Sequence, residues 1–140
     1  MVVGIAVLAT NLAASAWGAV GWVRKDARAS IVFWPLLRAA QAAVVVEAVV
    51  GLLLVARGAS TPDGLHIAYG IAPLVISLVS EGMRAAVAQR ELEDVEDVDA
   101  LELSEQITLA KRVALAEMGV MTVGALLILT LALRAFQTGG

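Results

Sequence analysis

The chain has 140 residues, of which 60% are hydrophobic, 16% are charged and 4% are aromatic, and its mean hydropathy is +0.86. Soluble domains are typically about 45–50% apolar and about a quarter charged, so we predict an integral membrane protein. The lack of Cys excludes disulfide frameworks and thiolate chemistry, a single His excludes a His-rich metal site built from one chain, and a net charge of −3 with scattered basic residues excludes a nucleic-acid-binding surface.

Four segments are long and apolar enough to cross the hydrocarbon core, which is about 30 Å thick and takes roughly 20 helical residues. They are residues 1–23, 31–56, 65–83 and 113–133. Spans joined by short connections pack as antiparallel neighbours. The sequence therefore predicts an all-α, antiparallel four-helix bundle, a single transmembrane domain that covers residues 1–140.

The first span carries a stripe of small residues that permits close approach of another helix, within the chain or between subunits. This stripe contains Ala14, Gly18 and Gly21. Trp17, Trp22 and Trp34 are predicted to lie at one membrane interface as aromatic anchors.

Local signals mark the ends of the second and third helices. Ser30 is a candidate cap for the start of the second helix, and Asp63 for the start of the third. Arg57-Gly58, followed by the turn residues 60–64, predicts the end of the second helix. Pro73 lies inside the third span, where it predicts a kink.

Basic residues gather in the first and third connections. They are Arg24, Lys25, Arg28, Arg84, Arg90, Lys111 and Arg112, whereas the second connection and the C-terminal end carry only Arg57 and Arg134. By the positive-inside rule the first and third connections lie in the cytoplasm. We therefore place the chain in the cytoplasmic (inner) membrane with both termini outside.

The third connection, residues 90–105, is strongly acidic. Its acidic residues are Glu91, Glu93, Asp94, Glu96, Asp97, Asp99, Glu102 and Glu105, and Val95, Val98, Leu101 and Leu103 are interspersed among them. Two interpretations remain open: a solvated helical extension or loop, and a docking surface for a partner.

One face of the third span is polar through the full thickness of the membrane. At 100° per residue this stripe contains His66, Tyr69, Pro73, Ser77, Ser80, Glu81 and Arg84. Charges within a bilayer need a partner or a role. We predict structural ion pairs among Arg38, Glu81, Arg84 and Glu117, with Arg38 bound to Glu81 or Glu117; a proton pathway through the same carboxylates is the alternative.

Glu47 is predicted to lie near mid-membrane, at the depth of Asn11 and away from basic residues. One interpretation is a neutral carboxyl group hydrogen-bonded to Asn11, Gln41 or Thr122. The other is a proton-carrying or ligand-binding carboxylate. Asn11 and Gln41 are thus candidates for a buried polar group or a proton relay.

His66 and Tyr69 form a candidate cofactor-binding site at the outer face. Histidine ligates haem and donates hydrogen bonds to quinones, although one chain cannot supply two histidine ligands. A hydrogen-bonded interfacial histidine is the alternative.

Residues 40–73, AQAAVVVEAVVGLLLVARGASTPDGLHIAYGIAP, combine a helix containing Gln41 and Gly51, a short loop and a helix opened by Leu65-His66. This arrangement resembles one helical hairpin of the haem A synthase family. The resemblance implies a four-helix relative in which His66 is a possible axial ligand. The partner histidine and the cysteines of that family are missing here, so the resemblance does not imply haem A synthesis.

Three functions follow from these observations. The first is an accessory or assembly subunit of a larger membrane complex, such as a respiratory complex. In this role the protein contacts the lipid bilayer and either other membrane subunits or copies of itself. The second is a redox membrane protein that binds haem or quinone at the outer face. The third is a small proton-coupled transporter that uses Glu47, Glu81 and Glu117. The sequence contains no complete set of catalytic residues, which favours a non-enzymatic protein.

Overall fold

The computed structural model describes residues 2–59 and 64–138, and for residues 64–66 and 138 the backbone alone. Within these ranges the chain forms helices and no strands. The helices are α1 (Val2–Val23), the short 3-10 helix η1 (Ala27–Ala29), α2 (Ser30–Ala56), α3 (Gly64–Leu92) and α4 (Leu103–Thr138). All four long helices of the described part have the length and hydropathy to cross a membrane. The predicted all-α membrane bundle is confirmed.

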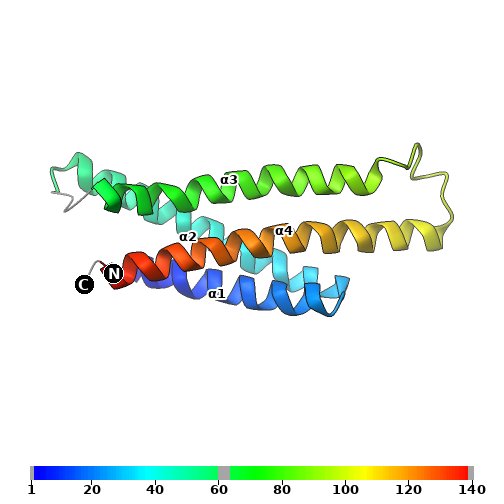
Figure 1. Ribbon diagram of the computed structural model, residues 1–140, viewed down its shortest axis with the longest axis horizontal. Helices are drawn as coiled ribbons and strands as arrows, with labels where there is room; N and C mark the ends of the chain where they lie inside the picture. The colour runs from blue at the N-terminus through cyan, green and yellow to red at the C-terminus, as the bar shows by residue number, and fades with distance from the viewer. Residues whose placement is uncertain (1, 60–63, 139–140) are drawn as a thin grey trace.

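Helices α3 and α4 continue beyond their predicted spans. The 29 residues of α3 and the 36 residues of α4 correspond to about 43 Å and 54 Å of helix, more than the roughly 30 Å of hydrocarbon. Their extra turns pair the two helices beyond the α1–α2 turn (Figure 1). Of the acidic connection 90–105, residues 93–102 are non-helical, and the residues on either side extend α3 and α4 because Glu, Gln, Arg and Ala favour helix.

The turn between α1 and α2 is closed by backbone and Asp26 hydrogen bonds. Lys25 adopts a left-handed conformation with φ of 52°, and the Asp26 side chain accepts a hydrogen bond from the Arg28 amide at 3.0 Å. Ser30 does not cap α2: its hydroxyl donates to the Ala27 carbonyl at 2.6 Å, inside the preceding 3-10 turn. The capping prediction was wrong because η1 supplies the turn that a cap would have closed.

The predicted end of α2 is confirmed. Gly58 has φ of +83°, a conformation that glycine adopts without a Cβ penalty. The amide of Ala59 donates to the Leu54 carbonyl at 3.0 Å, as in a Schellman motif. The turn residues 60–63, including the proposed cap Asp63, lie outside the described residues. Helix α3 continues through Pro73 without a break.

Helix α4 lies at the centre of the bundle, between α1 and α3 (Figure 1). The most extensive contacts are those of α3 with α4, α1 with α4 and α1 with α2. Helix α2 crosses obliquely, from α1 toward the first turns of α3. We call the end with residues 24–29 and 93–102 the connection end, and the end at which α1 begins and α4 finishes the terminal end.

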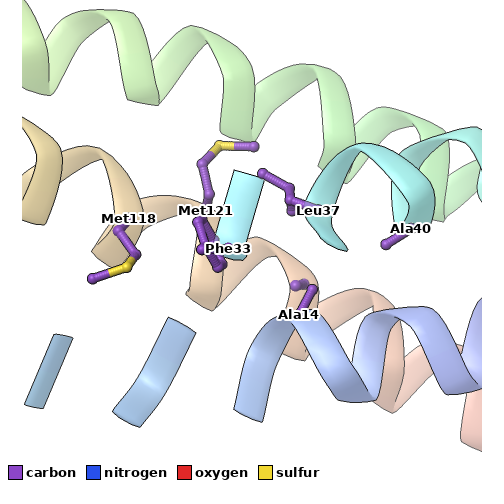
Figure 2. Close-up of a cluster of buried hydrophobic side chains, with 7 residues drawn as sticks. Ala14, Phe33, Leu37, Ala40, Met118 and Met121 are labelled. Carbon is purple, nitrogen blue, oxygen red and sulfur yellow. The ribbon is translucent and has the colours of Figure 1, made fainter. Parts of the chain in front are cut away.

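The larger core cluster sits in the connection-end half, and a smaller one, of Val7, Val44 and Ile128, lies farther toward the terminal end. Phe33 and Met118 are fully buried, and Leu37 and Met121 nearly so, against Ala14 of α1 (Figure 2). The predicted small-residue stripe is confirmed as packing within the chain. A Cβ on Gly18 would collide with Phe33 and Thr122, and one on Gly21 would meet Ala29 and Met118. Glycine is needed at both positions for this close approach.

Candidate functional site

Four charged side chains from three helices form a connected cluster, which we call the charged cluster. It consists of Arg38 of α2, Glu81 and Arg84 of α3, and Glu117 of α4, together with the amide of Gln41. Arg38 Nη1 lies 2.5 Å from Glu81 Oε1. The sequence placed these residues at one depth, and the structure brings them together.

Arg84 is the centre of this cluster. Its Nε donates to Glu81 at 2.8 Å, and its Nη1 donates to Glu117 at 2.8 Å. Arg84 thereby joins α3 to α4, whereas Arg38 joins α2 to α3 through Glu81. The formal charges of the four groups cancel, and both carboxylates are held by guanidinium groups. This arrangement favours structural ion pairs over the alternative of a proton pathway.

The ring of Trp34 completes the cluster. The guanidinium carbons of Arg38 and Arg84 lie 5.7 Å and 5.6 Å from the ring centroid, within the range of cation–π attraction. Phe33 meets the same ring edge-on. Sequence reasoning assigned Trp34 only to the membrane interface. The (i, i+4) spacing of Trp34 and Arg38 is the signal that could have indicated the contact.

Asn11 and Gln41 lie together in the bundle, apart from Glu47. Both line a small internal cavity of about 10 Å³ with Ser77 and Ser80. The Asn11 amide donates to the Val7 carbonyl at 2.9 Å, and the Gln41 amide donates to Glu81 at 2.9 Å. Asn11 and Gln41, two of the partners that the sequence proposed for Glu47, thus make these contacts, and the third, Thr122, has no hydrogen-bond partner among the described residues.

Glu47 lies beside Gly4 of α1, since a Cβ on that glycine would come within 3.3 Å of Glu47 Oε1. Gly4 precedes Asn11 by about two helical turns. Glu47 is therefore closer to the terminal end than predicted. The reason is the register set by the short α1–α2 turn: Gly18 packs against Phe33, and Gly4 and Glu47 lie the same fourteen residues farther along the two antiparallel helices.

A larger cavity of about 320 Å³ opens between α2, α3 and α4 toward the terminal end. We call it the terminal cavity. It is lined by Glu47, Ala48, Gly51, Leu52, Val55, Ile67, Tyr69, Gly70, Ile71 and Ala135. Its walls are apolar except near Glu47 and Tyr69. Sequence analysis considered these two residues for separate sites, and the structure places them around one space.

The phenol of Tyr69 has a defined partner. Its oxygen accepts a hydrogen bond from Arg134 Nε of α4 at 3.3 Å. A phenol that accepts in this way keeps its own proton for donation. His66 lies in the first turn of α3, one turn before Tyr69, and its side chain lies outside the described part of the chain. Its role as a ligand stays a prediction.

The acidic connection folds back on α4. The Glu102 amide donates to Glu105 Oε2 at 3.2 Å, which closes the first turn of α4, and Glu91 forms an ion pair with Arg112 at 2.7 Å. Val95 and Leu101 line a shallow groove with Leu109. Across the described residues no group of three or more acidic, His or Cys side chains is arranged to hold a metal ion.

Comparison with known proteins found no family model, no curated protein and no solved structure that matches the chain.

Proposed function

We propose that this chain is a membrane subunit that binds an amphiphilic molecule of the quinone class in the terminal cavity. The observation that carries the proposal is the Tyr69 hydroxyl at the wall of an apolar cavity of about 320 Å³. Ligand sites typically measure about 300–1,000 Å³ and combine apolar walls with a few polar groups that fix orientation.

The polar groups suit a ring that carries carbonyl oxygens. The Tyr69 oxygen accepts a hydrogen bond from Arg134 at 3.3 Å. The hydroxyl hydrogen of Tyr69 is therefore available to donate to a carbonyl oxygen of the ligand. Glu47 supplies a carboxyl group at the cavity wall, a partner for a ligand hydroxyl. The ring oxygens of a quinone are carbonyls, and in the reduced quinol the same oxygens are hydroxyls. The open side of the cavity leaves room for an isoprenoid tail in the lipid.

Haem fits this cavity less well. Its iron would need a nitrogen, sulfur or phenolate ligand on one or both faces. The described lining offers Tyr69, which is engaged with Arg134, and the chain contains one His and no Cys. The residues present therefore favour a ligand held by hydrogen bonds over one held by axial ligation.

The test is to purify the chain in mild detergent, add a short-chain quinone and measure binding by equilibrium dialysis. Tyr69→Phe removes the donor without changing ring volume. Loss of a hydrogen bond to a ligand costs about 0.5–1.5 kcal/mol, so we expect a Kd about two- to thirteenfold higher. The same affinity for the wild type and Tyr69→Phe would contradict the proposed role of the hydroxyl.

A second candidate function is an accessory or assembly subunit of a larger membrane complex, such as a respiratory complex. The observation that favours it is Arg38, whose side chain is 54% exposed although it lies on a membrane-spanning helix. A guanidinium group at such a position needs a polar partner on its open side. An acidic or carbonyl group of a neighbouring subunit would supply it.

Cross-linking separates this candidate from a protein that acts alone. A photoreactive residue at Arg38 should capture one discrete membrane protein in native membranes. The same residue at Leu52, which is 71% exposed on the other half of α2, is the control. Capture of lipid alone from both positions would argue against a subunit partner.

We also propose the orientation that the basic residues favour, with the connection end in the cytoplasm and both termini outside the inner membrane. Because the chain has no Cys, single cysteines can be introduced at Ser60 and Ala100. A membrane-impermeant maleimide added to intact cells should label Ser60→Cys and spare Ala100→Cys. The reverse pattern would overturn the orientation.

A further inference from the structure

A long apolar groove runs along the outer face of α3 and α4, away from the terminal cavity. Its volume is about 480 Å³. Val79 and Met83 of α3 form one side, Val120 and Val123 of α4 form the other, and Trp22 of α1 borders it. We call it the α3–α4 groove.

The groove has the length of one membrane leaflet. Along α4 it extends from Ala116 to Leu127, which is about 17 Å of helix. Half of a hydrocarbon core of about 30 Å is about 15 Å. Gly119 and Gly124 lie among its lining residues, and the absence of a Cβ lets Trp22 pack against the first and Ser80 against the second.

Basic side chains stand where the groove reaches the connection end. Two residues after Trp22 the chain continues with Arg24 and Lys25, both exposed. One turn before Ala116 on α4 lies Arg112, which is paired with Glu91 of α3 at 2.7 Å. The charged groups of the α1–α2 turn beside it are Arg24, Lys25 and Arg28 against Asp26. The balance of this turn is positive, and the acidic residues of the third connection lie beyond it, past the extra turns of α3 and α4 (Figure 1).

We propose that the α3–α4 groove binds one anionic phospholipid, with an acyl chain in the groove and its phosphate against Arg24 and Lys25. The apolar lining suits the chain, its length matches one leaflet, and the positive α1–α2 turn complements the headgroup. A helix of a second copy would instead place apolar side chains beside this cluster of charges. The inference uses different residues from the quinone proposal and does not depend on it.

Native mass spectrometry of the full chain with phosphatidylglycerol and phosphatidylcholine of identical acyl chains tests the headgroup. We expect a single phosphatidylglycerol adduct retained in preference to phosphatidylcholine. A basic residue near a membrane surface changes anionic-lipid affinity by about fivefold, so Arg24→Gln should weaken phosphatidylglycerol binding by about that factor and leave phosphatidylcholine unchanged. Arg57→Gln, at the terminal end, is the matched control and should change neither lipid. Equal retention of both lipids by the wild type would overturn the proposal.

A bulky substitution tests the groove itself. Val123→Trp fills it, whereas Leu126→Trp adds the same side chain to an exposed position of α4 outside the lining. We expect the retained adduct to disappear in the first variant and persist in the second. If Val123→Trp fails to fold, Val79→Trp fills the opposite wall. The proposal would be overturned if the lipid adduct persisted in folded groove variants. It would also be overturned if the wild type were a dimer that these variants converted to a monomer without loss of lipid.

Discussion

At the connection end, α1, α2 and α4 pack around Phe33 and Met118, both fully buried, and the charged cluster binds α2 and α4 to α3. At the terminal end, the second half of α2 leaves α1, its apolar side chains are largely exposed, and the terminal cavity opens beside it. Interhelical packing and hydrogen bonds stabilise membrane bundles, since lipid is as apolar as the helices. The connection-end half therefore carries the larger core cluster and the ion pairs. In the terminal half Val7, Val44 and Ile128 pack together, and the last turns of α2 beside the terminal cavity are open to a ligand.

Truncation of a core side chain should separate the two halves most clearly. Phe33→Ala removes a fully buried ring and should lower the free energy of unfolding by about 3–5 kcal/mol. Leu52→Ala, at a side chain that is 71% exposed, should change it by less than about 0.5 kcal/mol. Unfolding in mixed micelles measures both. Similar losses would show that this part of α2 is packed as tightly as the core.

Loss of Arg84 should have the next largest effect. Arg84→Leu leaves Glu81 and Glu117 without their shared partner. Stranded charges cost several kcal/mol in the interior of soluble proteins and less in membrane bundles, so we expect about 1–2 kcal/mol. Arg38→Leu, at a half-exposed position, should cost less than about 1 kcal/mol. Arg57→Leu, at the terminal end, is the control. Equal melting temperatures of all three variants would contradict a structural role for the charged cluster.

A small gain in stability is expected inside the core. Thr122 is buried, and its hydroxyl has no hydrogen-bond partner among the described residues. Thr122→Val replaces it with a methyl group of similar shape and removes this unsatisfied donor, which should raise stability by up to about 1 kcal/mol. Thr130→Val is the control, since that hydroxyl is exposed and donates to the Leu126 carbonyl. A lower melting temperature for Thr122→Val would reveal a polar contact at this site.

Periodicity and length predicted the bundle because each span must satisfy its backbone within the membrane. Gly58 marked the end of α2 correctly, since its conformation is a local property. Ser30 misled because capping depends on the preceding turn, which here is the 3-10 helix η1. The continuation of α3 to Leu92 was missed, since hydropathy reports where a helix meets lipid and not where it ends.

For the candidate site, depth along each helix was enough to group Arg38, Glu81 and Glu117. It could not show that Arg84 would hold two carboxylates, or that Trp34 would stack beside it, because these contacts depend on how each helix is rotated. Glu47 was separated from Tyr69 in the sequence analysis. The oblique crossing of α2 brings both to the terminal cavity, and a crossing angle cannot be read from a single sequence.

The most direct measurement compares ligand binding by two glycine variants of α3. Gly70 lines the terminal cavity and Gly82 lies outside it, and a Cβ at either position meets nothing within 4 Å. Both Gly70→Leu and Gly82→Leu should therefore fold. Equilibrium dialysis over a range of short-chain quinone concentrations should show that binding is abolished in Gly70→Leu and unchanged in Gly82→Leu. Retention of wild-type affinity by folded Gly70→Leu would contradict the account.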